Sequence, residues 1–266
     1  MKMLLKISFD GSGYAGFQFQ KNAPTVQGVL TEAASGLYGR SANVTGCSRT
    51  DAGVHAAGFC ATVDIPGVER PDLVIPASAL PRAFNARLPE DISVLSAIAV
   101  PDDFHPRYSA IDKTYRYLIC ASPLRLPLLR GRVFFPKRPV SPSAVEIMAQ
   151  AARRLEGKRD FASFMASGSK ILDTVRTVKK AEVTEKDGII TVLLCADGFL
   201  YNMVRIISGT LLETGLSGLS PDSVDGVIAA RDRKKAGATL PPYGLYLCSV
   251  NYGDEYSFPD TGGLLP

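Results

Sequence analysis

The segment GCSRTDAGVHAAG (residues 46–58) places a guanidinium, a carboxylate and an imidazole among small residues; they belong to Arg49, Asp51 and His55. Such groups can act as acids, bases or nucleophiles, and small neighbours let a backbone approach a substrate closely. The alternative is a tight turn, because Asp hydrogen-bonds to its own backbone and Gly accepts positive φ. The rest of the sequence has to decide between a reactive loop and a turn.

A dinucleotide site is the first competing chemistry. Gly11, Gly13 and Gly16 have G-x-G-x-x-G spacing after an expected strand. That fingerprint needs a helix directly after it and a parallel sheet. Here the extended stretch FQFQKNAP follows and ends in proline. The glycines therefore indicate a turn between strands, and we reject an oxidoreductase.

Metal and thiol chemistry are also poorly supported. The five cysteines are scattered, and the only histidines are His55 and His105. A zinc site needs about four ligands at short paired spacings. Cys47 lies near His55 in sequence, but no third group is in place to orient the imidazole. We expect buried cysteines and ordinary hydrogen-bonded histidines.

Basic residues are unevenly distributed. The chain has 30 Lys and Arg against 26 Asp and Glu, a net charge of only +4. The window Lys113–Arg138 nevertheless contains seven basic residues and no acid, and Arg231–Lys235 forms a second cluster. Such a window is either a solvated face or the binding surface of a polyanion such as a nucleic acid.

No apolar run approaches the ~20 residues that a membrane span needs. The first residues, MKMLLKISFD, introduce Lys6 and Asp10 too early for a signal peptide. We therefore expect a cytoplasmic protein without a membrane segment. Its composition, 46% hydrophobic and 21% charged, is that of a globular chain with ample core material.

Hydrophobic periodicity and capping signals predict the same order of elements twice, β-α-β-β-α-β. In the first half we expect strands at 4–10, 43–48, 59–65 and 91–100, with helices at 26–39 and 77–88. In the second we expect a strand at 113–121, a helix from 142, a hairpin at 174–196 around Asp187-Gly188, helices from 200 and 220, and a strand at 244–252. This order predicts an α+β fold of two ferredoxin-like halves, residues 1–105 and 106–266, sharing an antiparallel sheet core.

A non-catalytic RNA-binding module is the main alternative, because the RNA-recognition motif has the same element order. Its third strand carries a basic residue and alternating aromatics. The stretch GFCATVDI supplies only Phe59 and no basic residue. The expected stacking platform is missing from that strand.

The motif SRTDAGVHA (48–56) resembles the signature of the tRNA pseudouridine synthase A (TruA) family. The segments DGSGYAGFQFQ, TVQGVL, FNARLPEDISVLSA, DFHPRYSAIDKTYRY, DFASF, GFLYNMVR and ATLPPYGLYLCSVNY are similar to family segments in the same order, from about Leu4 to Tyr252. Ser48 departs from the pattern, because the family usually has glycine there. A serine is small, so only the fine geometry beside the motif is in question.

This resemblance implies an isomerase that converts uridine to pseudouridine at positions 38–40 of the tRNA anticodon stem-loop. It further implies a homodimer and neither metal nor organic cofactor. Asp51 matches the family's essential nucleophile. A carboxylate can either attack C1′ of the ribose or remove the C2′ proton to give a glycal, and the sequence leaves both routes open.

Three further site residues follow from the resemblance. Arg205 matches the arginine opposite the catalytic Asp, so the cleft is expected between the halves; by pattern alone it is an ordinary solvent-facing arginine. Tyr115 matches the tyrosine that stacks on the target base, whereas its alternation with Tyr117 equally suits cross-strand packing. Arg49 is expected to contact the substrate backbone or fill the space that a flipped base vacates.

Overall fold

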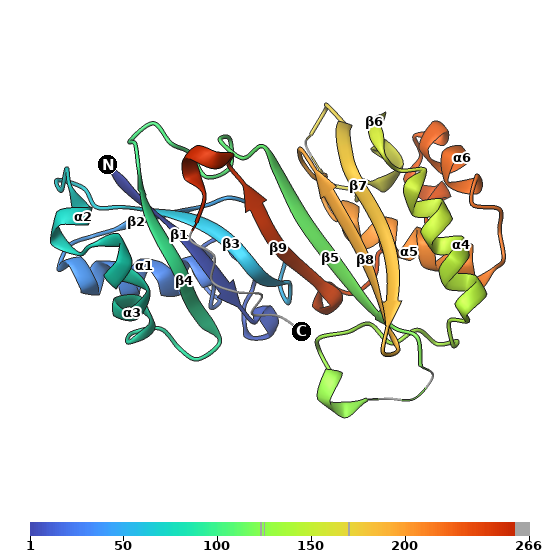
Figure 1. Ribbon diagram of the computed structural model, residues 1–266, viewed down its shortest axis with the longest axis horizontal. Coiled ribbons are helices and arrows are strands. Elements are labelled where there is room, and N and C mark those ends of the chain that lie inside the picture. The colour runs from blue at the N-terminus through green and yellow to red at the C-terminus, as the bar shows by residue number, and fades with distance from the viewer. Residues whose placement is uncertain (123, 125, 170, 259–266) are drawn as a thin grey trace. The chain divides into compact units, whose positions relative to one another are not determined.

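The computed structural model describes residues 1–122, 124, 126–169 and 171–258 (Figure 1). Its contacts divide the chain into two compact units. The N-terminal unit comprises Met1–Ile111 together with the C-terminal segment from Leu247, and the central unit comprises Asp112–Tyr246. The N-terminal unit thus includes most of the strand predicted at 244–252, which we expected in the second half, residues 106–266.

The strands of the N-terminal unit pair antiparallel in the order β4-β1-β3-β2. They are β1 (Lys2–Phe9), β2 (Asn43–Gly46), β3 (His55–Asp64) and β4 (Ile92–Val100). In β1 the side chains of Met3, Leu4 and Leu5 are all buried, so this inner strand contributes core residues from consecutive positions. β3 begins earlier than predicted, at His55, and so includes the end of the SRTDAGVHA motif.

The helices of this unit are α1 (Val26–Tyr38), α2 (Pro71–Val74) and α3 (Leu80–Asn85). Thr25 caps α1 by accepting the Gly28 N–H, and Gly39 ends it with φ 63°. The helix predicted at 77–88 is shorter, because a 3₁₀ turn precedes α3. Pro81 explains this, since proline is tolerated in the first turn of a helix and not in its interior.

The strands of the central unit pair antiparallel in the order β5-β8-β7-β6. They are β5 (Asp112–Cys120), β6 (Gly157–Asp160), β7 (Val175–Lys186) and β8 (Ile189–Ala196). The first two residues of β9 (Leu245–Asn251) are assigned to this unit and the rest to the N-terminal unit. The predicted hairpin is confirmed: Asp187 and Gly188 form its turn with φ values of 53° and 79°. Two successive positive φ values are what a tight two-residue hairpin requires.

The helices of the central unit are α4 (Pro142–Arg153), α5 (Met203–Leu216) and α6 (Ser223–Ala230), which lie together in Figure 1. Ser141 caps α4 by accepting the Ala144 N–H. Helices α4 and α5 pack so closely that a Cβ at Gly215 would lie 2.8 Å from Cγ of Met148. α5 begins at Met203 and not at Leu200, since Asn202 before it has a left-handed backbone, φ 60°.

The predicted α+β class is confirmed by this mixture of helices and antiparallel strand pairs. The ferredoxin-like arrangement of two halves stays a prediction. No helix within the described ranges combines the length and apolarity needed to cross a bilayer.

Candidate active site

The loop between β2 and β3 carries Asp51 and Arg49. Its entry is fixed by a hydrogen bond of 2.8 Å from the Cys47 N–H to the Cys60 carbonyl. Its exit is a turn in which the Val54 N–H donates to the Asp51 carbonyl at 3.2 Å. Asp51 is half-buried and Arg49 is exposed. Both functional groups therefore belong to a short loop that is tied down at its two ends.

The turn after β1, which contains Gly11 and Gly16, packs directly against this loop. A Cβ at Gly11 would overlap the Val54 carbonyl, and a Cβ at Gly16 would overlap the Thr50 carbonyl. Gly16 also has φ 95°, which side-chain-bearing residues rarely adopt. No helix follows this turn directly, since α1 begins only at Val26. The glycines thus allow the backbone of the Asp51 loop to approach the turn.

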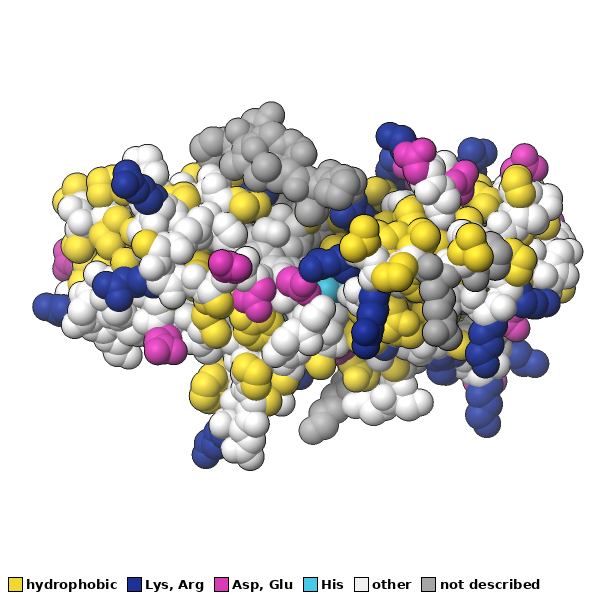
Figure 2. Space-filling view, turned by 90° about the horizontal axis from the view of Figure 1, so that it is seen from below, with side chains coloured by type: hydrophobic (Ala, Val, Ile, Leu, Met, Phe, Trp, Pro, Cys, Tyr) yellow, Lys and Arg dark blue, Asp and Glu magenta, His cyan; other side chains and the backbone are white. Residues whose placement is uncertain are grey.

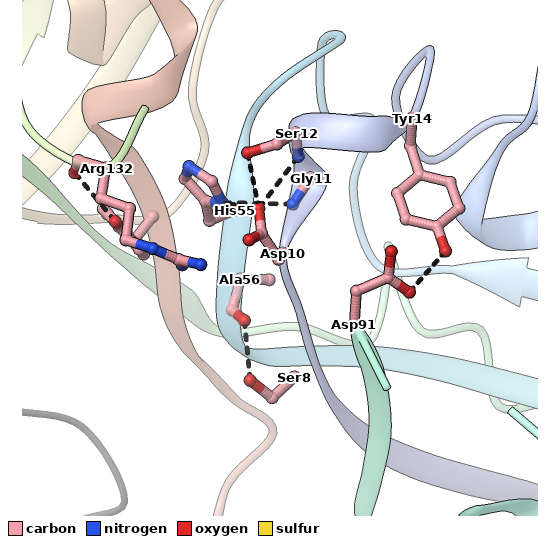
Figure 3. Close-up of polar contacts among 10 residues, drawn as sticks. Ser8, Asp10, Gly11, Ser12, Tyr14, His55, Ala56, Asp91 and Arg132 are labelled. Carbon is pink, nitrogen blue, oxygen red and sulfur yellow. Dashed lines mark hydrogen bonds and ion pairs between the residues drawn. The ribbon is translucent and has the colours of Figure 1, made fainter. Parts of the chain in front are cut away.

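His55 lies at the junction of the loop and the turn, where only 1% of its surface is exposed (Figure 3). Its Nδ1 accepts the Gly11 N–H at 3.1 Å and lies 3.0 Å from Oδ1 of Asp10. Asp10 Oδ1 also accepts the N–H and the hydroxyl of Ser12, at 3.0 and 2.7 Å. The expected hydrogen-bonded role of His55 is confirmed. Its partner Asp10 went unnoticed in the sequence, although an Asp directly before Gly-Ser is a typical turn signal.

A second polar contact stabilises the same turn. The Tyr14 hydroxyl donates to Oδ1 of Asp91 at 2.7 Å (Figure 3). Burial, followed by the Asp91 carboxylate, raises the pKa of Tyr14 well above its ordinary value. Tyr14 therefore stays a neutral hydrogen-bond donor that joins the turn to the start of β4.

Arg205 lies on α5 of the central unit and is half-buried. Its Nε donates to the Leu240 carbonyl at 2.7 Å, and its Nη1 donates to Oδ1 of Asn202 at 2.6 Å. The guanidinium is thus held in a fixed position and does not simply extend into solvent. Leu240 could not be identified from sequence as its partner, because that contact spans 35 positions, whereas Asn202 lies only three residues before Arg205.

Tyr115 and Tyr117 share one face of β5. The Tyr115 side chain is 6% exposed, and its ring meets the Phe199 ring edge-on with a centroid distance of 4.9 Å. The Tyr117 hydroxyl donates to the Pro241 carbonyl at 2.7 Å. Burial raises the pKa of Tyr117, Tyr243 acts in the same direction, and the positive charge of Arg205 opposes both. Arg205 therefore acts electrostatically on a tyrosine that shares its strand face with Tyr115.

The four predicted site residues consequently fall into two groups. Arg49 and Asp51 lie in one loop of the N-terminal unit, and Tyr115 and Arg205 lie in the central unit. Their action on one substrate stays a prediction. Within the described part of the chain, no group of three or more His, Cys, Asp or Glu side chains could hold a metal ion.

The acid-free window Lys113–Arg138 is only partly a surface feature. Lys113 is buried, and the Arg116 guanidinium lies 5.1 Å from the centroid of the Tyr246 ring. The exposed members are Arg130, Arg132, Lys137 and Arg138, while Arg125 lies outside the described residues. Figure 2 shows Lys and Arg side chains in dark blue that project from the surface beside hydrophobic ones.

In the second basic cluster, Arg231–Lys235, some residues make internal contacts and others are exposed. Arg231 forms an ion pair with Asp160 at 2.9 Å. Arg233 donates to the Ala236 carbonyl and to Oγ1 of Thr239, and so stabilises the chain that follows it. Lys234 and Lys235 are exposed. These two lysines are the members of the cluster best suited to contact a polyanion.

Comparison with known proteins gives one consistent result. The profile of a family described as tRNA pseudouridine synthase matches residues 6–109 and 151–253. These ranges contain Arg49, Asp51 and Arg205, and Tyr115 lies between them. The chain is 43% identical over 252 residues to tRNA pseudouridine synthase A of Ruminiclostridium cellulolyticum, covering 94% of this chain and 99% of that protein. It is 42% identical over 250 residues to the protein of the same name from Thermoanaerobacter sp., with coverages of 94% and 99%.

Proposed function

This chain belongs to the tRNA pseudouridine synthase A family, and from that premise we propose that it isomerises uridines 38–40 of the tRNA anticodon stem-loop through the carboxylate of Asp51. Pseudouridine formation in tRNA makes it an isomerase. The assignment of Asp51 is supported by the constrained loop in which its carboxylate lies. The carboxylate is half-buried, Arg49 lies two residues away, and the backbone is fixed by the turn at Gly11 and Gly16.

The reaction breaks the bond between N1 of uracil and C1′ of the ribose, and it forms a bond between C5 and C1′. The hydrogen on C5 leaves as a proton, and N1 gains one, so no atom is lost. Asp51 serves either by attacking C1′ or by removing the C2′ proton. Both routes need an ionised carboxylate close to the ribose. Small neighbours such as Ala52 and Gly53 permit that approach.

We assign to Arg205 the role of stabilising the negative charge of Asp51. An arginine side chain stays protonated in proteins and presents several donors in a fixed fork. Leu240 and Asn202 each accept one hydrogen bond from this guanidinium. Orienting acceptors of this kind reduce the entropy lost when the group engages a reacting carboxylate.

Tyr115 is assigned to the target base. A uridine in a stem must leave the base stack before a protein group can reach it, at a cost of a few kcal/mol. Stacking of a base on an aromatic ring contributes about 1–3 kcal/mol and offsets part of that cost. The contact between Tyr115 and Phe199 holds the ring in one orientation. Arg49 then contacts the substrate backbone or fills the vacated space.

We further propose that the enzyme is a cytoplasmic homodimer, as the family resemblance implies. The exposed basic residues of the central unit, including Lys137, Arg138, Lys234 and Lys235, supply electrostatic affinity for the tRNA. The proposed chemistry needs neither metal nor organic cofactor, because proton transfers and one carboxylate suffice for the isomerisation.

The proposal is tested by incubating the purified protein with an unmodified tRNA transcript, without added metal or nucleotide, and mapping pseudouridine along the product. A matched transcript with cytidine at positions 38–40 is the control. We expect pseudouridine at 38–40 in the first transcript and none in the second. Binding of the transcript without any conversion would contradict the proposal and support the non-catalytic RNA-binding module.

A further inference from the structure

The segment before β5 exposes a cluster of one tyrosine, one arginine and one histidine. Tyr108 is 75% exposed although it is a large aromatic residue. Its ring lies against that of His105 with a centroid distance of 4.4 Å, and the Arg107 guanidinium lies 5.7 Å from its centroid. All three residues belong to the N-terminal unit. We call them the Tyr108 platform.

The platform rests on a fixed turn. The His105 carbonyl accepts the N–H groups of Tyr108 and Ser109, at 3.1 and 2.9 Å. The His105 ring is oriented in turn, because its Nδ1 accepts the Arg107 N–H at 3.1 Å. His105 itself donates its backbone N–H to the Ser109 hydroxyl at 3.2 Å. The exposed ring is therefore carried by a backbone whose hydrogen bonds are satisfied locally.

Other residues of the same segment pack into the core. Phe104 is buried, and its ring contacts those of Tyr252 and Tyr256 at centroid distances of 5.2 and 4.9 Å. The Tyr252 hydroxyl donates to the Pro106 carbonyl at 2.8 Å. Alternate residues of the segment thus face the core, while Arg107 and Tyr108 face solvent. A surface ring held in this way loses little freedom when a ligand binds to it.

We propose that the Tyr108 platform stacks on an unpaired base of the tRNA other than the uridine that is isomerised. Bases stack on tyrosine and histidine rings and on the planar guanidinium of arginine. The platform combines all three kinds of surface, and the positive charge of Arg107 suits a nearby phosphate. Two acids precede the platform: Asp102 forms an ion pair with the N-terminus at 2.6 Å, and Asp103 is exposed. This inference rests on the proposed function, because it needs tRNA as the ligand.

The test measures the dissociation constant of an unmodified tRNA transcript for the protein and three variants. Tyr108→Ala removes the ring, Tyr108→Phe retains it, and Phe19→Ala removes another exposed aromatic of the same unit, 62% exposed. Loss of one stacked base costs about 1–3 kcal/mol, which weakens binding roughly 5- to 150-fold. We expect that loss in Tyr108→Ala and near-normal affinity in Tyr108→Phe and Phe19→Ala. Equal losses in Tyr108→Ala and Phe19→Ala, or no loss in either, would overturn the proposal.

A series of tRNAs, each lacking the base at one unpaired position, then identifies the ligand. We expect one abasic position that weakens binding to the unaltered protein and causes no further loss in Tyr108→Ala. If every abasic position weakens both proteins equally, no base stacks on the ring. Loss of the dimer in Tyr108→Ala, seen by light scattering, would instead assign the platform to a contact between two copies of the chain. Because binding is read without turnover, failure of the isomerase assignment would appear separately, as unconverted uridine with the unaltered protein.

Discussion

The Arg205 guanidinium donates from Nη1 to Oδ1 of Asn202 at 2.6 Å, and Asn202 is the residue whose left-handed backbone precedes α5. The same residue therefore accepts a hydrogen bond from the arginine through its side chain and precedes the helix through its left-handed backbone. With the Leu240 carbonyl on Nε, the guanidinium has two acceptors from different parts of the central unit. The effect of this positive charge on turnover and the effect of its position can therefore be tested with separate variants.

Replacing Arg205 by Met removes the charge and keeps much of the side-chain volume. Loss of a charged hydrogen-bond partner costs about 1.5–3 kcal/mol, so we expect turnover to fall roughly 10- to 150-fold. The affinity for tRNA should change less. Single-turnover rates and dissociation constants for the same transcript measure the two effects. A loss confined to affinity would show that Arg205 contacts a phosphate and does not assist Asp51.

Asn202→Gly is the matched test of the position of Arg205. Glycine accepts the backbone φ of 60° without strain, so the helix start is retained while the acceptor is lost. We expect a smaller fall in turnover than in Arg205→Met, with an unchanged melting temperature. A fall equal to that of Arg205→Met, in a protein that melts normally, would mean that orientation matters as much as charge.

Gly16→Ala should displace the backbone of the Asp51 loop at Thr50. The new Cβ would overlap the Thr50 carbonyl, and the residue would be held at φ 95°. Unfavourable backbone conformations of this kind cost about 1–3 kcal/mol. We expect a lower free energy of unfolding and a reduced turnover. Gly13→Ala is the control, because a Cβ there would meet no described atom within 4 Å. Equal behaviour of the two variants would contradict the close packing of the turn on the loop.

Tyr115→Phe and Tyr115→Leu separate the two roles open to Tyr115. Phenylalanine keeps the ring and its edge-on contact with Phe199, whereas leucine removes the ring. After C5 is joined to C1′, its proton must leave, and acid–base assistance typically contributes ~10²–10⁴-fold. We expect Tyr115→Phe to bind tRNA normally, to turn over much more slowly and to show an isotope effect with substrate deuterated at C5. Normal turnover in Tyr115→Phe, with the loss only in Tyr115→Leu, would leave stacking as the sole role.

The regular elements were predictable where a local signal specifies them. Thr25 and Ser141 cap α1 and α4, and Asp187-Gly188 supplies the hairpin turn. The short strand β6 was missed, because its residues GKRD have no apolar alternation and it is defined by backbone pairing with β7. Such a strand exists only through its neighbour, so periodicity alone cannot reveal it.

For the candidate site, the sequence indicates which groups to propose as reactive but not which residues hold them in place. Arg49 and Asp51 stand out because small residues surround them. The contacts of His55 with Gly11 and Asp10 span more than 40 positions, and those of Arg205 with Leu240 span 35. The charge window was a weaker guide to the surface, since Lys113 is buried and Arg116 is half-buried. A run of like charges in sequence alternates between the two faces once it lies on a strand such as β5.

The central claim is that the Asp51 carboxylate carries the isomerisation, and Asp51→Asn tests it most directly. Asparagine keeps the size of the side chain and removes its negative charge. Pseudouridine at positions 38–40 is quantified in single turnover, with excess enzyme over unmodified tRNA, beside the dissociation constant of the same complex. We expect no pseudouridine above background, with tRNA affinity within several-fold of the unaltered protein. Pseudouridine formation at a substantial fraction of the normal rate would contradict the account.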